Sequence, residues 1–270
     1  LLKVNFMHSI GILGCGWLGI SLAINFKKLE YRVLGSKTSL KGLSEIEKIG
    51  IESYLVVLKK NKSEGILPFV KNIETLIISV PPQKKISDFN FTEKIQTLIN
   101  SIKSSSLKKL IFLSSTSVYG SKGGVFDESQ KCSPDSHSAI ELHDCEKLIQ
   151  ELSIPSVIVR LGGLIGEDRN PIYHLQNKII KNPNGRINFV HKDDAVNGIS
   201  SLVSNIKIKG IFNLVSPHHP TRKLYYKHVS KKYNLNEPRF ENSEKIVRII
   251  NGDKITKMTE FNYSVDNLLI

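Results

Sequence analysis

A glycine-rich turn near the start of the chain constrains the fold more than any other feature. The turn reads Gly14-Cys15-Gly16-Trp17-Leu18-Gly19, and it follows an apolar run and opens a stretch with helical spacing. Gly14 permits a tight turn, Gly16 lets the backbone approach a pyrophosphate, and Gly19 lets the helix pack close to the strand. The helix N-terminus adds unpaired N–H groups and the positive end of a dipole. The pattern predicts a dinucleotide-binding turn.

Apolar runs and amphipathic stretches alternate along the first 160 residues. Runs typical of buried strands occupy 8–13, 31–34, 52–58, 75–80, 109–114 and 156–161, and stretches with helical spacing occupy 17–29, 43–49, 86–105 and 138–152. This alternation predicts an α/β protein with a Rossmann-type doubly wound parallel sheet.

The pattern loosens after Gly166, where it predicts helices over 172–181, 193–204 and 221–233 and a strand over 211–215. We therefore expect a dinucleotide-binding domain over 7–163 and a smaller C-terminal substrate lobe over 164–270. The segment from about 190 to 216 is expected to return to the first domain.

The end of the second predicted strand bears on the choice of dinucleotide. NAD sites usually place an acidic residue about 20 residues after the turn, where it binds the ribose 2′-hydroxyl. Here the chain has Ser36, Lys37 and Thr38, none of which is a carboxylate. A carboxylate repels a 2′-phosphate and a lysine attracts it, so the sequence favours NADP, with NAD as the alternative. The alternative is that Lys37 is only a solvated loop cation.

Ser79, Val80 and Pro81 end the fourth predicted strand. The carboxyl edge of such a sheet forms the crevice where ligands bind, so this backbone is a candidate to face the cofactor. The alternative is a plain proline pair that terminates the strand.

Charge and cysteine content exclude several classes of protein. The 38 Lys and Arg against 25 Asp and Glu give a net charge of +13, yet these cations are scattered and form no run interleaved with aromatic residues. We therefore expect no nucleic-acid partner. Cys15, Cys132 and Cys145 show no metal-ligand spacing, so no metal site is expected, and reduced thiols point to the cytoplasm. The sequence contains no run of about 18 apolar residues, so no membrane span is expected.

Three further segments resemble the extended and atypical short-chain dehydrogenase/reductases, the NAD(P)-dependent epimerase/dehydratase group. They are Ser-Ser-Thr-Ser-Val-Tyr-Gly at 114–120, Arg-Leu-Gly-Gly-Leu-Ile-Gly at 160–166, and Phe-Val-His-Lys-Asp-Asp-Ala at 189–195. The turn itself, Gly-Ser-Lys-Thr at 35–38 and Ser-Pro-His-His-Pro at 216–220 are similar to a bacterial branch of this group. The resemblance implies a Rossmann fold, a nicotinamide dinucleotide and a small-molecule substrate such as a nucleotide sugar. Exposed helices of the group often pair, which implies a homodimer.

The resemblance also implies catalytic positions, and two of them are not filled. The family hydroxyl that polarises the substrate oxygen corresponds to Ser115. The family pair Tyr-x-x-x-Lys corresponds to Ser138 and Leu142, which supply neither a phenol nor a cation. We consider His137 and Tyr119 as replacement proton donors, because a histidine near its usual pKa is a competent acid or base.

Each replacement has a structural alternative. His137 could be a loop residue before the helix, and Tyr119 a packing residue. The nearby His143 and Glu141 are further candidates for the proton donor, and His143 could instead be an exposed surface residue.

Candidate substrate-binding residues lie in the C-terminal part. Arg169, Arg186, His191 and Arg222 fall where the lobe should cover a pocket, and an arginine fork suits a diphosphate or a carboxylate. Two functions follow. One is an oxidoreductase or epimerase acting on a nucleotide sugar or a similar small carbonyl or hydroxyl compound. The other is a non-catalytic NADP-binding sensor or interaction module.

Overall fold

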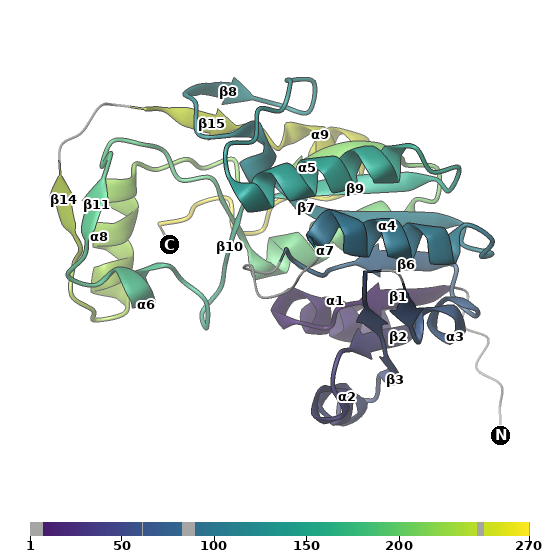
Figure 1. Ribbon diagram of the computed structural model, residues 1–270. Helices are drawn as coiled ribbons and strands as arrows, with labels where there is room; N and C mark the ends of the chain where they lie inside the picture. The colour runs from purple at the N-terminus through teal and green to yellow at the C-terminus, as the bar shows by residue number, and fades with distance from the viewer. Residues whose placement is uncertain (1–7, 61, 83–89, 242–245, 270) are drawn as a thin grey trace. The chain divides into compact units, whose positions relative to one another are not determined.

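The computed structural model describes residues 8–60, 62–82, 90–241 and 246–269 (Figure 1). Its largest sheet has seven strands. Their order across the sheet is β13 (Gly210–Leu214), β9 (Ser156–Leu161), β7 (Lys109–Ser115), β6 (Thr75–Ile78), β1 (Ser9–Leu13), β2 (Arg32–Lys37) and β3 (Glu52–Leu55). Strand β1 pairs in parallel with β2 and β6, β2 with β3, and β6 with β7. The predicted Rossmann-type α/β fold is confirmed.

The order of strands reverses on either side of β1. The chain builds β2 and β3 outward on one side, then returns to place β6, β7 and β9 on the other. Ile12 of β1 therefore lies between Gly35 of β2 and Ile77 of β6. Parallel sheets of this kind bind ligands at the carboxyl ends of the strands where the order reverses. The turn after β1 and the residues after β6 both lie at this point.

Helices connect the strands. These are α1 (Trp17–Lys28), α2 (Leu40–Glu47), α4 (Phe91–Ile102), α5 (His137–Gln150) and α7 (Lys192–Ser204). Because crossovers between parallel strands are right-handed, the reversal of strand order places α1 and α2 on one face and α4 and α5 on the other. Helices α4 and α5 pack against each other (Figure 1). Asn90 begins α4 with a capping box to Glu93, and Ser136 caps α5.

Some predicted boundaries shift. The helix predicted over 86–105 begins at Phe91, and residues 86–89 lie outside the described part of the chain. The strand predicted over 52–58 is divided: β3 is followed by β4 (Val57–Leu58), which pairs antiparallel with β5 (Ser63–Glu64) and precedes the short helix α3 (Ile66–Val70). A run of apolar residues does not show where a strand leaves one partner for another.

The helix predicted over 172–181 is wrong. A short helix, α6 (Ile172–Leu175), is followed by Asn177 with a φ of 59°, and the chain then forms β11 (Ile179–Lys181). Asparagine tolerates this left-handed conformation, which ends a helix. Strand β11 pairs with β14 (Arg239–Glu241), a partner too distant in sequence for local spacing to reveal.

The chain forms two compact units that interleave along the sequence. The first contains the described residues up to Ser114 together with Ser136–Val159 and Ile199–Ile211, and the second contains Ser115–Asp135, Arg160–Gly198 and the chain from Phe212 onward. The sequence predicted a boundary at residue 163. In the structure, the chain enters the second unit at Arg160 instead. Residues 115–135 join the second unit because β8 (Gly124–Phe126) pairs with β15 (Arg248–Ile250).

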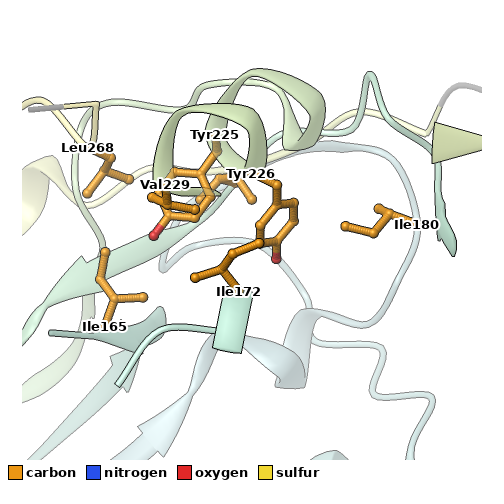
Figure 2. Close-up of a cluster of buried hydrophobic side chains, with 8 residues drawn as sticks. Ile165, Ile172, Ile180, Tyr225, Tyr226, Val229 and Leu268 are labelled. Atoms are coloured by element: carbon orange, nitrogen blue, oxygen red, sulfur yellow. The ribbon is translucent and has the colours of Figure 1, made fainter. Parts of the chain in front are cut away.

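The second unit has an apolar core of its own. Its short elements include η1 (Thr116–Tyr119), α8 (Arg222–Lys232), α9 (Asp253–Met258) and the paired strands β10 (Gly163–Ile165) and β12 (Phe189–His191). Figure 2 shows Tyr225, Tyr226 and Val229 of α8 directed toward Ile172 and neighbouring apolar side chains. Within the described ranges, no helix combines the length and the apolar composition that crossing a membrane requires.

Candidate functional site

The three glycines of the turn after β1 are required for three different reasons. Gly14 has a φ of +98°, and a Cβ there would lie 2.7 Å from Cγ1 of Val80. A Cβ on Gly19 would lie 2.4 Å from the carbonyl oxygen of Gly14. A Cβ on Gly16 would meet no heavy atom within 4 Å. The space beside Gly16 is therefore open, while Gly14 and Gly19 are closed in by protein.

The N-terminus of α1 opens at this turn. Gly16 is the N-cap residue, so no side chain caps the helix, and the first turn carries no acidic residue. The positive end of the helix dipole is thus not offset locally, which suits an anion. A main chain open at Gly16 beside this helix end fits a pyrophosphate.

Ser36 holds the turn in place. Its side chain is only 2% exposed, and its hydroxyl oxygen accepts a hydrogen bond from the Gly14 N–H at 3.0 Å. Its carbonyl oxygen accepts another from the Cys15 N–H at 3.0 Å. The sequence placed Ser36 beside the adenosine ribose, and the structure shows that it positions the glycine-rich turn. No local pattern marks this role, because the bonded residues are far apart in the sequence.

Cys15 and Leu18 contribute packing to the turn. Both are buried, and the Cys15 sulfur faces β2, where a Cβ on Gly35 would lie 2.7 Å from it. Burial raises the pKa of the Cys15 thiol to about 11, since the thiolate is poorly solvated there. Cys15 is therefore an inert thiol. Trp17 is half-buried at the first position of α1.

The other predicted cofactor residues lie around the same sheet edge. The Ser79 N–H donates to the Leu13 carbonyl at 2.9 Å, Val80 touches the turn, and Pro81 is exposed. Lys37 ends β2, and its Nζ lies 3.2 Å from Oε2 of Glu45. The exposed Thr38 follows it. The structure thus gathers the turn, the end of β2 and the residues after β6.

Tyr119 is a buried packing residue. The ring is fully buried, and the hydroxyl accepts a hydrogen bond from Arg160 at 2.9 Å and donates one to Asn213 at 2.9 Å. Burial raises the pKa of Tyr119, with Arg160 opposing the effect. Both features disfavour proton transfer by this phenol. Ser115, the last residue of β7, accepts a hydrogen bond from the Ser117 N–H at 3.1 Å, and no acceptor among the described residues takes its hydroxyl proton.

Helix α5 carries the two positions at which the family resemblance implies a tyrosine and a lysine. Ser138 is exposed in its first turn, and Leu142 is buried. His137 begins the helix with a side chain 61% exposed, and its Nε2 lies 3.7 Å from Oε2 of Glu141. Glu141 itself accepts a hydrogen bond from the Phe91 N–H at 2.7 Å, so its role is to cap α4. His137 is thus accessible, whereas Glu141 is committed to structure.

Two predicted substrate residues lie side by side in the second unit. The Arg222 N–H donates to the Gly185 carbonyl, next to Arg186, and Arg186 donates to the His219 carbonyl at 3.1 Å.

Arg248 of β15, which sequence reasoning did not consider, is a further arginine close to Arg222, and its guanidinium donates to the Gly120 carbonyl. Burial lowers the pKa of Arg248; the nearby Asp135 carboxylate opposes this effect, and Arg222 adds to it. Nothing local in the sequence links Arg248 to Arg222.

His191 lies elsewhere in the same unit. It lines a cavity of about 250 Å³ together with Tyr225, Asn170 and Ser264. Arg169 is exposed after β10 and does not line this cavity. Of the four predicted residues, His191 alone lines this cavity.

No family model matches the chain. Protein YeeZ of Escherichia coli K12 is 30% identical over 270 residues, spanning 98% of this chain and 98% of YeeZ. Among solved structures, the UDP-Glc/GlcNAc 4-epimerase of Campylobacter jejuni matches with a TM-score of 0.82 and 15% identity over 97% of this chain and 96% of that one. UDP-glucuronic acid 4-epimerase of Bacillus cereus, in complex with NAD, matches with a TM-score of 0.80 and 18% identity over 97% and 94%. The structural matches concern the fold.

Proposed function

Since the chain belongs to the same family as Protein YeeZ of Escherichia coli, we propose that this family is an atypical branch of the extended short-chain dehydrogenase/reductase superfamily. We propose further that the chain binds a nicotinamide dinucleotide at residues 14–19. The observation that carries this proposal is the open space at Gly16, beside an uncapped helix N-terminus. Gly14 and Gly19 show that the turn is packed tightly on both sides of that opening. A tight turn with one exposed glycine is what a pyrophosphate needs.

NADP is the dinucleotide that the end of β2 favours. Ser36 is buried against the turn. The next residue along the chain, Lys37, ends β2 and carries a positive charge. A 2′-phosphate beside Lys37 would gain an ion pair, whereas no carboxylate stands in β2 to bind a 2′-hydroxyl.

The substrate that we propose is a nucleotide sugar or a similar small carbonyl or hydroxyl compound. Two neighbours in fold are 4-epimerases named for UDP-linked sugars. Arg186, Arg222 and Arg248 supply guanidinium groups of the kind that bind a diphosphate. When bound, the nicotinamide takes up or returns a hydride.

The chain's own residues would orient the substrate and move the proton. Ser115 retains a hydroxyl proton that can be donated to the substrate oxygen. His137 is accessible, and an imidazole is chemically competent as a general acid or base. Tyr119 is the weaker candidate, because its hydroxyl is already bonded to Arg160 and Asn213.

A second candidate function has one specific observation in its favour. Ser138 and Leu142 leave α5 without the phenol and the cation that the family uses for proton transfer, and buried Leu142 has no charge to offer. A protein that binds NADP without turning it over, as a sensor or an interaction module, would tolerate this loss.

The test combines binding and turnover. We expect calorimetry to show NADPH and NADH binding, with NADPH the tighter. Incubation with NAD(P) and a panel of UDP-sugars should then change nicotinamide absorbance or interconvert the sugars, as followed by chromatography. We expect Ser115→Ala and His137→Ala to lower turnover at least tenfold without loss of dinucleotide binding.

Each result has a clear meaning. Binding without turnover of any sugar would favour the non-catalytic alternative. Binding of neither dinucleotide would refute the proposal.

A further inference from the structure

The Lys37 side chain, at the end of β2, is held in place by contacts with α2. A Cβ on Gly42 would lie 3.1–3.2 Å from Cβ, Cγ and Cδ of Lys37, so the lysine stem lies directly on the first part of α2. Ser39 caps this helix by accepting a hydrogen bond from the Gly42 N–H at 3.2 Å. The Lys37 side chain is only 18% exposed. Lys37 is thus a fixed cation, unlike a lysine that moves freely in solvent.

Glu45 holds the other end of this side chain. It lies in α2 three residues after Gly42, and its Oε2 is 3.2 Å from the Lys37 Nζ. The Glu45 side chain is 54% exposed, so the carboxylate faces solvent beside the ammonium group. The fold therefore places an acidic group next to the end of β2, where the sequence of β2 itself has none.

We propose that Glu45 sets the preference of this site between NADP and NAD by competing for Lys37. This inference rests on the proposed function. A 2′-phosphate reaching Lys37 must share the ammonium group with Glu45 and approach a second negative charge. A 2′-hydroxyl carries no charge and meets neither penalty. Glu45 thus reduces the advantage of NADP and keeps NAD acceptable.

Removing the carboxylate should strengthen the preference for NADPH. In Glu45→Gln, calorimetry should show NADPH binding roughly two- to fivefold tighter, the range expected for one partly exposed ion pair, with NADH binding changed less than about twofold. The gain in the NADPH/NADH affinity ratio should diminish at high salt, because these charges are screened.

Two variants serve as controls. Glu47→Gln removes the same charge from the same helix, but the Glu47 carboxylate accepts a hydrogen bond from Ser53, so the ratio should stay as in the unaltered protein. In a Lys37→Met background, Glu45→Gln should lose most of its effect, because the group for which Glu45 competes is gone.

The outcomes separate this inference from the proposed function. If both dinucleotides bind and Glu45→Gln leaves the ratio within twofold of the unaltered protein, the role of Glu45 is refuted while the binding function stands. An equal effect from Glu47→Gln, or a full effect in the Lys37→Met background, refutes it as well. If neither dinucleotide binds the unaltered protein, both proposals fail.

Discussion

At positions 14, 16 and 19 one residue type meets three separate requirements. Gly14 needs a positive φ, Gly19 needs close approach to the carbonyl of Gly14, and Gly16 has open space around it. The first two requirements belong to folding. The third has no structural cause within the described residues, which is why Gly16 carries the assignment of the site.

This difference can be tested by comparing two substitutions. Gly16→Val adds a side chain to open space at an N-cap position, so it should cost at most about 1 kcal/mol of stability yet abolish NADPH binding. Gly19→Ala places a Cβ 2.4 Å from the Gly14 carbonyl oxygen, so the chain must shift, at a cost of about 1–3 kcal/mol. Urea unfolding and calorimetry measure the two effects. NADPH binding that survives Gly16→Val would contradict the assignment.

Ser36 and Tyr119 show what residue types alone leave undecided. Both carry a hydroxyl and both were candidates for contact with ligands. The structure directs the Ser36 oxygen to the Gly14 N–H and surrounds the Tyr119 hydroxyl with Arg160 and Asn213. A hydroxyl serves equally well in a site or in a core, so its partners must be seen before its role is known.

Among the elements, α7 has a C-terminus capped by a buried lysine. Lys109 of β7 is inaccessible to solvent, and its Nζ donates to the carbonyls of Leu202 and Asn205 at 2.5 and 2.6 Å. Burial lowers the pKa of Lys109 to about 8. A neutral amine still has two N–H groups for these two carbonyls.

The lowered pKa predicts a pH dependence of stability. Between about pH 8 and the unfolded pKa of about 10.4, the unfolded chain binds more protons at this lysine than the folded chain, so stability rises with pH. Lys109→Met removes this dependence. The free energy of unfolding of the unaltered protein, relative to Lys109→Met, should rise by about 1.5 kcal/mol from pH 8 to 9.5.

Lys108→Met provides the control, since the Lys108 side chain is 59% exposed and pairs with Glu74 at the surface. Urea titrations at the two pH values measure all three proteins. The prediction fails if the unaltered protein and Lys109→Met respond to pH in the same way.

Elements could be predicted from the sequence where their causes are local. The strands and helices around β1, α1 and β7 follow from hydrophobic spacing and from glycine. The helix predicted over 172–181 failed because Asn177 adopts a positive φ and β11 finds its partner in β14. A short apolar run fits a helix or a strand, and only pairing with distant residues decides between them.

At the scale of the whole molecule, the two units share the chain so closely that neither is continuous. The chain passes between them after Ser114, Asp135, Val159, Gly198 and Ile211. A piece ending at residue 163 would lack β13 of the large sheet, and the remainder would lack β8, the partner of β15. We therefore expect the units to fold together.

This expectation can be measured on the intact chain. The single tryptophan, Trp17, lies in the first unit, and six of the eight tyrosines lie in the second. Unfolding in urea should give coincident transitions by Trp17 fluorescence and by tyrosine near-ultraviolet circular dichroism. Fragments 1–163 and 164–270, expressed separately, should each lack a cooperative transition. Two separated transitions in the intact chain would show that the units unfold independently.

The sequence by itself determined the strands of the large sheet and most of the helices between them, the glycine turn and the absence of an acidic residue in β2, because these depend on residues close together in the chain. Only the tertiary structure decided that Ser36 positions the turn, that Glu45 faces Lys37, that Tyr119 is enclosed, and that Arg248 lies near Arg222. The physical reason is that hydrogen bonds, ion pairs and burial act over a few ångströms in space, whatever the separation along the chain.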